Sequence, residues 1–511
     1  MSQLLEKLAK WKPFTAVVVG DFMLDQLEYG NADRLSPEAP VPVLHVQKRE
    51  DRPGGAANVC LDLVAMRGTV HALGVTGEDR EADLLRAALA AAGVQSDGLV
   101  SDPTRPTTVK KSMIGLAQHR HPQKMFRVDY ESRAPLPREA EDGIIAKFRG
   151  LIGSGNAGAG ADVVCIEDYN KGVCTERVCR EVIGIARERG VPVLVDPAAI
   201  EDYSKYRGAT TITPNRLEAS LAAGIEIGDD AAPDQHGAIA KKLLTELDLE
   251  TVVVTLDRHG ALLLERGRKA LAVPTVARQV YDVTGAGDMV LAALAGARAN
   301  GIGWPDAVRL ANAAAGLEVE VFGVVPMPIE RIHREVMLRE GGAAGAGQGK
   351  LRTLEQLVVE VAAVRSDGKK VVFTNGCFDV LHAGHLSLLR RAAAEGEFLV
   401  VAVNADDSVR RLKGKKDPSR PINTEQDRAE LLAGLECVDA VVVFVEDTPE
   451  RVIQSIRPDV LVKGAEYSID QVPGARFVED SGGRVVLLEM VEGKSTSAIV
   501  AKARASKAPA G

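Results

Sequence analysis

The chain has 511 residues, of which 46% are hydrophobic, 26% are charged and 4% are aromatic, and its net charge is −8. This composition is typical of a globular protein with two or three domains, and it excludes a basic, aromatic-rich surface for nucleic acid. No apolar run approaches the ~18 residues of a membrane span, and the N-terminal residues do not resemble a signal peptide. The cysteines show no CxxC spacing, so we expect reduced thiols in a cytoplasmic protein, with neither nucleic acid nor membrane as a partner.

The first two thirds of the chain alternate short β-branched runs with stretches rich in Ala and Leu. The apolar runs predict buried strands at residues 16–20, 162–167, 191–196 and 251–256. Arg177–Arg189 has the apolar spacing of a helix. This alternation predicts an α/β fold, with a parallel sheet covered by helices on both faces.

Two segments break the alternation. Residues 31–47 contain three prolines, and residues 107–130 hold strand-like runs rich in basic and polar side chains. We expect these segments to form a small antiparallel sheet that projects from the main layer as a lid.

A Gly- and Ala-rich stretch at residues 341–349 predicts a flexible linker. After it the alternation restarts, with predicted strands at residues 370–375, 398–403, 439–444 and 459–463. The sequence therefore predicts three parts: a first domain at 1–340, a linker at 341–350 and a smaller second domain at 351–511.

The motif Asp282-Val-Thr-Gly-Ala-Gly-Asp288 precedes a helical stretch at residues 290–299. Glycines at a helix start let backbone amides approach an anion, and the helix dipole favours negative charge there. Beside such an anion hole, Asp288 can accept the proton of an attacking hydroxyl while the amides stabilise a transferring phosphoryl group. The alternative is that Asp288 is only a favourable charge at a helix N-terminus.

Together with three other motifs, this one resembles the ribokinase-type carbohydrate kinases over residues ~14–330. The other motifs are Gly20-Asp21, Pro53-Gly-Gly-Ala-Ala-Asn58 and Pro214-Asn-Arg-Leu-Glu218. The resemblance implies a general base at Asp288 and ATP contacts from the same loop, at Thr284, Gly285, Ala286 and Gly287.

The resemblance also implies that Asn215 and Glu218 organise Mg²⁺ and phosphate through water, so that no direct metal ligand is expected. A helix cap with a first-turn carboxylate is the alternative for this pair. On the sugar side, the expected contacts are Asp21, Asp25, Gly54, Gly55, Asn58, Lys110, Arg127 and Lys171, of which the last three are basic residues near the lid. For Asp21, the alternative is a turn-capping aspartate at a strand end.

A second motif, Gly376-Cys-Phe-Asp-Val-Leu-His-Ala-Gly-His385, follows a predicted strand and opens an amphipathic helix at residues 386–394. His382 and His385 lie three residues apart, so both rings can face one point. A metal site is the alternative, but no third ligand lies at a typical spacing, and Gly384 favours close approach of the backbone to phosphate.

This motif resembles the HxGH motif of the cytidylyltransferase-like nucleotidyltransferases, which implies a Rossmann-like domain whose two histidines stabilise a triphosphate. Lys413 belongs to a basic loop that either clamps phosphates or is a solvated surface. The other implied nucleotide contacts are Gly376, Phe378, Asp379, Ser495, Thr496 and Ser497. The last three follow Lys494, where the family's second phosphate motif has an apolar residue, and a Ser/Thr helix cap is their alternative.

The order of the domains and the phrase Arg34-Leu-Ser-Pro-Glu-Ala-Pro-Val-Pro-Val43 extend the resemblance to the whole chain. It resembles the family of bifunctional heptose-7-phosphate kinases and heptose-1-phosphate adenylyltransferases of Gram-negative bacteria. The resemblance implies ATP as substrate in both reactions, ADP-heptose for lipopolysaccharide core as the product, and a homodimer. The alternatives are a kinase fused to a cytidylyltransferase for another phosphosugar, and a non-catalytic ligand-sensing scaffold.

Overall fold

The computed structural model describes residues 4, 7–8, 10–116, 122–153, 160–226, 228, 235–275, 283–321, 323–341, 348–414, 417–465 and 468–489. The contacts of the chain divide it into two compact units, Trp11–Ile332 and Met1–Lys10 with His333–Gly511. The predicted linker lies largely outside the described residues, so the domain boundaries remain a prediction. Among the described residues, none of the helices has both the length and the hydropathy that a membrane crossing requires.

A nine-stranded sheet forms the centre of the unit Trp11–Ile332, in the order β13-β12-β11-β10-β9-β8-β1-β4-β5. Its strands are β1 (Phe14–Gly20), β4 (Gly68–Thr76), β5 (Leu99–Ser101), β8 (Val163–Glu167), β9 (Val193–Asp196), β10 (Thr211–Ile212), β11 (Thr251–Thr255), β12 (Ala261–Glu265) and β13 (Leu271–Val273). Neighbours from β5 to β11 pair in parallel, as predicted. The antiparallel strands β12 and β13 were not predicted, and they arise because a short loop returns the chain beside β11.

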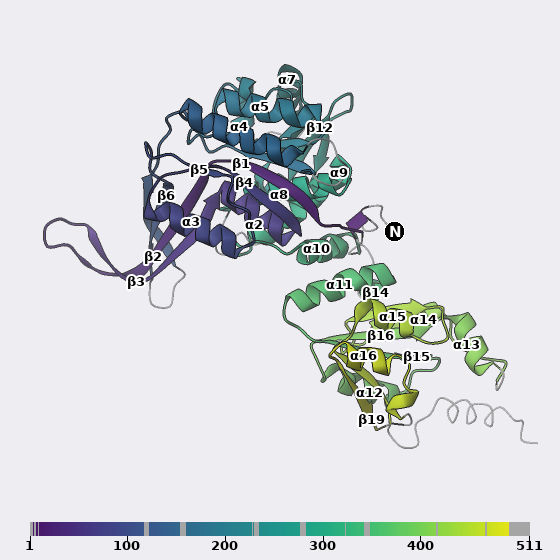
Figure 1. Cartoon of the computed structure of the whole chain (residues 1–511). Helices are drawn as coiled ribbons and strands as arrows, with labels where there is room; N and C mark the ends of the chain where they lie inside the picture. Colours follow the sequence, from purple (N-terminus) through teal and green to yellow (C-terminus); the bar gives the residue numbers. More distant parts are fainter. Residues whose placement is uncertain are drawn as a thin grey trace, which may run out of the picture. The chain divides into compact units, whose positions relative to one another are not determined.

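Helices cover both faces of this sheet (Figure 1). The helices and 3-10 turns of this part of the chain are α2 (Ala56–Ala65), α3 (Arg80–Ala91), α4 (Arg138–Ile152), α5 (Glu176–Glu188), η1 (Ser204–Tyr206), α6 (Arg216–Ala223), α7 (His236–Glu246), η2 (Asp257–His259), α8 (Ala286–Ala299), α9 (Trp304–Glu318) and α10 (Ile329–Gly341). Alternate strand residues such as Val17, Val164 and Val252 form one buried core with α4 to α7. Helices α2, α8 and α9 contact strands of the sheet as well. The predicted two-sided cover is therefore confirmed.

The two segments that break the alternation form a four-stranded sheet, called the lid sheet here, in the order β3-β2-β6-β7. Its strands are β2 (Phe22–Leu35), β3 (Pro42–Gly55), β6 (Thr108–Gly115) and β7 (Gln123–Tyr130), and Figure 1 shows β2 and β3 as a long hairpin. The prediction of an antiparallel sheet was wrong at its centre, because β2 and β6 pair in parallel. Both strands continue from parallel strands of the main sheet, β1 and β5, and so leave it in the same direction.

The second unit holds a six-stranded parallel sheet in the order β14-β17-β16-β15-β18-β19. Its strands are β14 (Leu351–Arg352), β15 (Val371–Gly376), β16 (Phe398–Asn404), β17 (Ala440–Phe444), β18 (Val460–Gly464) and β19 (Arg484–Leu488). Its helices and turns are η3 (Gln348–Lys350), α11 (Leu354–Ser366), α12 (Ala383–Ala393), α13 (Asp406–Lys413), α14 (Glu425–Ala433), α15 (Glu450–Ile456), η4 (Ile469–Gln471) and α16 (Ala475–Asp480). Helices α11, α15 and α16 bury one face of the sheet, and α12 and α14 bury the other. The predicted second α/β fold is confirmed.

Candidate active sites

The first site lies where α8 begins, at the carboxyl ends of β8 and β9. Helix α8 starts at Ala286, four residues earlier than predicted, and Gly285 caps it with φ 90°. A side chain at this position would be strained, and its Cβ would lie 2.7 Å from Glu318 Oε1. The early start places Ala286 and Gly287, two of the residues predicted to bind ATP, in the first helical turn, where backbone N–H groups point out of the helix. Thr284 precedes this turn, and Asp282 lies outside the described residues.

Asp288 is 3% exposed and is held in place by two hydrogen bonds. Tyr169 Oη donates to its Oδ1 at 2.7 Å, and Asn58 Nδ2 donates to its Oδ2 at 2.9 Å. Burial raises the pKa of Asp288, whereas the bonds from Asn58 and Tyr169 and the charge of Lys110 lower it. Asn58, a predicted sugar contact, also positions Asp288 through its Nδ2, and its Oδ1 has no hydrogen-bond partner among the described residues. Tyr169 was missed because it lies 119 residues away in the sequence.

Two further carboxylates lie beside Asp288. Glu167 and Asp196 end β8 and β9, and one oxygen from each of the three side chains lies within 4.8 Å of the others. Burial, then the nearby charge of Asp196, raises the pKa of Glu167, and burial, then the charge of Glu218, raises that of Asp196. Neither residue was predicted from the sequence. Their position at the carboxyl ends of adjacent parallel strands is the signal that could have found them.

Asn215 and Glu218 form a capping box at the start of α6. Asn215 Oδ1 accepts from the Glu218 amide at 3.0 Å, and Glu218 Oε2 accepts from the Asn215 amide at 2.9 Å. The pair therefore has the cap geometry that the sequence left as an alternative. Burial raises the pKa of Glu218, and the charge of Glu218 in turn raises the pKa of Asp196. The capping box therefore lies near the three carboxylates Glu167, Asp196 and Asp288. Asn215 and Glu218 supply carboxamide and carboxylate oxygens, which are the donors that Mg²⁺ prefers.

The two aspartates on the sugar side have different environments. Asp21 is 1% exposed and accepts hydrogen bonds from the backbone amides of Tyr169, Lys171 and Val173 at 2.8 to 3.2 Å. The geometry favours the structural alternative for Asp21, because its carboxylate organises this turn. By contrast, Asp25 Oδ1 has no hydrogen-bond partner among the described residues. Burial raises the pKa of Asp25 to about 6, against the charge of Lys110.

The glycine pair next to Asp25 leaves room for its side chain. A Cβ on Gly54 would lie 2.7 Å from Asp25 Oδ2, and Gly55 is the residue before α2. Of the two predicted aspartates in this region, Asp25 is therefore the one that is partly buried and has an oxygen without a partner among the described residues.

The three basic residues of the lid region also differ. Lys110 Nζ lies 4.7 Å from the centroid of the Tyr169 ring, and its charge lowers the pKa of Asp25 and of Asp288. Arg127 bonds Asp129 through two nitrogens at 2.7 and 2.9 Å. Lys171 is paired with Glu131 at 2.5 Å. Of these three basic residues, Lys110 is therefore the one whose charge acts on Asp288.

The second site lies at the start of α12, after β15. His382 precedes the helix, and its ring stacks on that of His385 with the centroids 3.9 Å apart. Phe378 packs its edge against His385 at 5.3 Å. Burial, followed by the charges of His382 and Lys413, lowers the pKa of His385 to about 4. His385 is therefore neutral at pH 7 and offers one N–H donor to an anion.

The other predicted nucleotide contacts fall into three groups. Gly376 ends β15, and Lys413 is an exposed residue at the end of α13 whose charge acts on His385. Asp379, predicted as a nucleotide contact, pairs with Arg420 and accepts from the amides of Ile422 at 2.6 Å and Asn423 at 3.2 Å. It therefore fixes a neighbouring loop. Ser495, Thr496 and Ser497 lie outside the described residues.

A buried arginine, which was not predicted from the sequence, supports the loop that Asp379 fixes. Arg428 has a fully buried side chain, and it donates to Cys377 O at 2.6 Å and to Asp406 Oδ1 at 2.7 Å. Arginine has no local sequence signal for burial, since most arginines are exposed.

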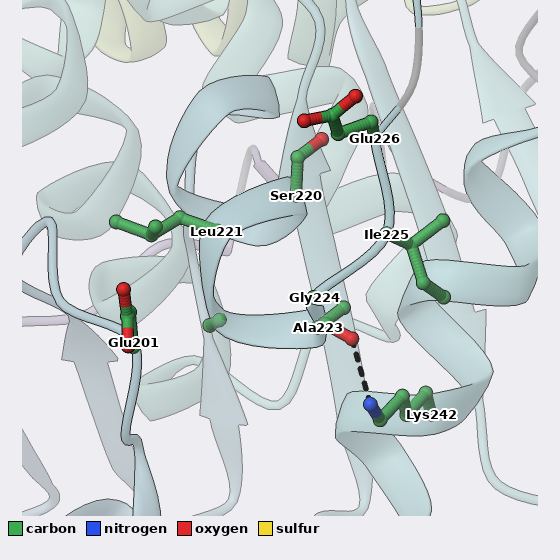
Figure 2. Close-up of a pocket in the computed structure, with 9 residues that line it drawn as sticks. Glu201, Ser220, Leu221, Ala223, Gly224, Ile225, Glu226 and Lys242 are labelled. Carbon is green, nitrogen blue, oxygen red and sulfur yellow. Dashed lines mark hydrogen bonds between the residues drawn. The ribbon is translucent and has the colours of Figure 1, made fainter.

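A hollow of about 480 Å³ lies elsewhere, at the C-terminal end of α6 (Figure 2). Its walls include Glu201, Ser220 and Lys242, and Lys242 Nζ donates to Ala223 O at 2.7 Å. The predicted residues of α6 lie at the opposite end of that helix, so this hollow is not part of the first site.

Comparisons with known proteins match both parts of the chain. The sequence profile of the pfkB family carbohydrate kinases matches residues 14–330, and the cytidylyltransferase-like profile matches residues 373–489. The bifunctional protein HldE of Geobacter sulfurreducens is 44% identical over 488 residues, which cover 95% of each chain. HldE of Pseudomonas aeruginosa is 44% identical and covers 96% of this chain and 97% of that protein. Phosphofructokinase-2 from Escherichia coli, solved with fructose-6-phosphate, has a TM-score of 0.51 and 18% identity over 63% of this chain and 98% of that one, a likeness that concerns the fold alone.

Proposed function

The chain belongs to the family of bifunctional HldE proteins, with a pfkB-type kinase part followed by a cytidylyltransferase-like part, and from this premise we propose two reactions. The first transfers a phosphoryl group from ATP to the anomeric hydroxyl of D-glycero-β-D-manno-heptose 7-phosphate. The second transfers an adenylyl group from ATP to heptose 1-phosphate, giving ADP-heptose for lipopolysaccharide core and releasing pyrophosphate. A phosphatase must act between the two, since the second substrate lacks the 7-phosphate.

In the kinase reaction, Asp288 takes the proton of the anomeric hydroxyl as that oxygen attacks the terminal phosphorus of ATP. Tyr169 and Asn58 hold both oxygens of Asp288, so the carboxylate is aimed before the sugar arrives. The amides of the first turn of α8 stabilise negative charge on the transferring group. Asp25 accepts hydrogen bonds from sugar hydroxyls, and Lys110 attracts the substrate's phosphate.

Mg²⁺ is part of this proposal, because the amide and carboxylate oxygens of Asn215 and Glu218 fit a hard cation that neutralises phosphate charge. The observation that carries the kinase assignment is the placement of Asp288: a buried carboxylate at a glycine-capped helix start, held by two side-chain donors.

In the adenylyltransferase reaction, the sugar phosphate attacks the α-phosphorus directly, so no covalent intermediate on the protein is needed. The neutral ring of His385 donates to the phosphate oxygens, and Phe378 and His382 fix its orientation. Lys413 adds positive charge nearby.

The test is product analysis by mass spectrometry with full-length protein, a panel of sugar phosphates, and ATP or CTP. We expect a heptose bisphosphate from the first substrate and ADP-heptose from the second, with ATP preferred over CTP. Transfer from CTP instead would contradict the second assignment. In His385→Ala, adenylyl transfer should fall by about 10²–10³-fold, by analogy with the loss of one oxyanion donor. Kinase activity and folding in the presence of a chelator should be unchanged, whereas a structural metal site would make the fold sensitive to the chelator.

The proposal includes two independent modules. The fragments 1–340 and 351–511 should each fold and keep their own activity, because domain boundaries fall in flexible linkers that few contacts cross. A folded but inactive fragment would contradict the modular assignment.

We also propose a cytoplasmic homodimer. All six cysteines are free, which suits a reducing compartment. Several large apolar side chains on or next to the lid sheet are exposed, and a second copy would cover them: Leu35, Val41, Val46, Phe126 and Tyr130. Light scattering measures the oligomeric state of the wild type and of Phe126→Glu in solution. A monomeric wild type would contradict the proposed dimer.

A further inference from the structure

Asp21 lies at a junction beside the first site. It stands between β1 and β2, and its side chain is 1% exposed. Its Oδ2 accepts from the backbone amides of Tyr169 at 2.8 Å and Lys171 at 3.0 Å, and its Oδ1 accepts from that of Val173 at 3.2 Å. Hydrogen bonds to a charged acceptor are stronger than those between neutral groups. Asp21 therefore anchors residues 168–174, called the β8–α5 turn here.

The β8–α5 turn has a conformation that needs anchors from outside it. Asn170 has φ 56°, and left-handed backbone at a residue other than glycine costs free energy. A second anchor is Arg105, whose guanidinium donates to Lys171 O at 3.2 Å and to Ala134 O at 2.8 Å. Asp21 thus holds the turn by its amides, and Arg105 holds it by a carbonyl.

The β8–α5 turn determines where the Tyr169 hydroxyl lies. Tyr169 Oη donates to Asp288 Oδ1 at 2.7 Å, and the amide of the same residue is bonded to Asp21 at 2.8 Å. A tyrosine side chain is a rigid ring on two staggered torsions, so a shift of its backbone moves the hydroxyl as well. Displacement of the turn would therefore misplace the donor that orients the proposed base.

The backbone of Asp21 supports the other donor to Asp288. Asp21 O accepts from the amide of Ala56 at 3.1 Å, and Ala56 is the first residue of α2. The same helix carries Asn58, whose Nδ2 donates to Asp288 Oδ2 at 2.9 Å. A Cβ on Gly55 would lie 2.6 Å from Asp21 O, so this close approach requires glycine. Both donors that hold the proposed base therefore belong to elements bonded to Asp21.

We propose that Asp21 is a positioning residue for phosphoryl transfer: its carboxylate holds the β8–α5 turn, and the turn aims the Tyr169 hydroxyl at Asp288. The inference rests on the proposed kinase function, and it assigns Asp21 to the orientation of the base rather than to sugar binding. Misplacement of a reacting group by about 1 Å can lower a rate about 100-fold. A change at Asp21 should therefore lower kinase turnover and leave the affinity for the sugar largely unaltered.

The first experiment uses Asp21→Asn in the full-length protein. The substitution keeps the shape of the side chain but replaces one acceptor oxygen by a donor, which then faces backbone N–H groups. With ATP and heptose 7-phosphate, kinase turnover should fall at least about tenfold, because the base is misplaced. The affinity for the sugar phosphate, measured by calorimetry without ATP, should change less than about threefold. A direct sugar ligand predicts a clear loss of affinity.

A double-mutant cycle with Tyr169→Phe shows whether Asp21 acts through the tyrosine. In the Tyr169→Phe background, Asp21→Asn should lower turnover less than about threefold, because no hydroxyl remains to be misplaced. Two independent contributions predict the same loss, of about tenfold or more, in both backgrounds. Circular dichroism of all four proteins checks that each is folded.

Glu141→Gln is the matched control. Glu141 is 8% exposed and accepts from Thr175 Oγ1 at 2.5 Å and from an Arg177 nitrogen at 3.0 Å. It is therefore another buried carboxylate of the same unit, and it fixes the residues that follow the β8–α5 turn. Because its bonds lead to the start of α5 and not to Tyr169, turnover should stay near that of the wild type even where stability falls.

Arg105→Lys is a second variant, which loosens the β8–α5 turn without changing Asp21. Lysine keeps the positive charge but lacks the fork of donors that reaches several carbonyls at once. Turnover should again fall, and it should fall much less in the Tyr169→Phe background. This variant decides the question if Asp21→Asn does not fold.

Three results would overturn the proposal: unchanged turnover in Asp21→Asn, a loss of sugar affinity as large as the loss of turnover, or the same loss of turnover with and without the Tyr169 hydroxyl. A wild type that phosphorylates no sugar phosphate would refute the proposed kinase function itself. An active wild type with an unaffected Asp21→Asn would refute the positioning role alone.

Discussion

His385 should make the stability of the second unit depend on pH. Its pKa falls from 6.5 to about 4 in the folded protein, first because of burial and then because of His382 and Lys413. The unfolded chain therefore binds a proton that the folded chain resists, and stability is lost as the pH falls from 6.5 toward 4. At about 1.36 kcal/mol per pKa unit, the full shift is worth roughly 3 kcal/mol. Solvent screening of this half-buried ring reduces the expected effect to about 1–2 kcal/mol.

The assay is urea unfolding of the wild type and of His385→Gln at about pH 7.5 and about pH 4.5. The sequence helps to separate the two units, because its two tryptophans, Trp11 and Trp304, both lie in the unit Trp11–Ile332. Tryptophan fluorescence thus follows the first unit, and circular dichroism follows both.

The acid-induced loss of stability in the second unit should be smaller in His385→Gln than in the wild type by about 1–2 kcal/mol. His259→Gln, which changes an exposed histidine of the first unit, should match the wild type. The same pH dependence in the wild type and His385→Gln would refute the argument that burial and repulsion disfavour the charged ring.

Three other substitutions test the contacts of the two sites. Asp288→Asn removes the proposed base and should lower kinase turnover by about 10²–10⁴-fold with adenylyl transfer intact, and near wild-type phosphorylation would contradict that role. Tyr169→Phe removes one hydrogen bond to the Asp288 carboxylate and should lower kinase turnover by about 10–100-fold, as expected for ~1.5–3 kcal/mol. Tyr206→Phe loses a matching 2.7 Å bond to Asp168 and serves as its control, with turnover near that of the wild type. Arg428→Met should destabilise the second unit by about 3–5 kcal/mol, seen by circular dichroism and not by fluorescence, because Asp406 loses its partner.

The sequence by itself determined the features that depend on neighbouring residues. Most strands of the two main sheets, the presence of a helix at the motif that ends at Asp288 and the HxGH turn at His385 follow from local patterns of apolar and glycine residues. The succession of two α/β folds is also predicted, because the alternation of strands and helices restarts after the Gly- and Ala-rich stretch. Asn215 and Glu218 also belong here, since a capping box closes within one helical turn.

Only the tertiary structure decided the features that join distant segments. The parallel pairing of β2 and β6 depends on where two strands of the main sheet end. Asp21 was expected to bind sugar, but its carboxylate accepts hydrogen bonds from three backbone amides of a turn about 150 residues away. The partners of Asp288 are likewise 119 and 230 residues away. Glu167 and Asp196 look like ordinary strand ends until adjacent parallel strands bring them together. A local sequence pattern predicts how its own segment folds. The charges around a carboxylate, however, come from every element that packs against it, and only the packing of the tertiary structure decides which elements those are.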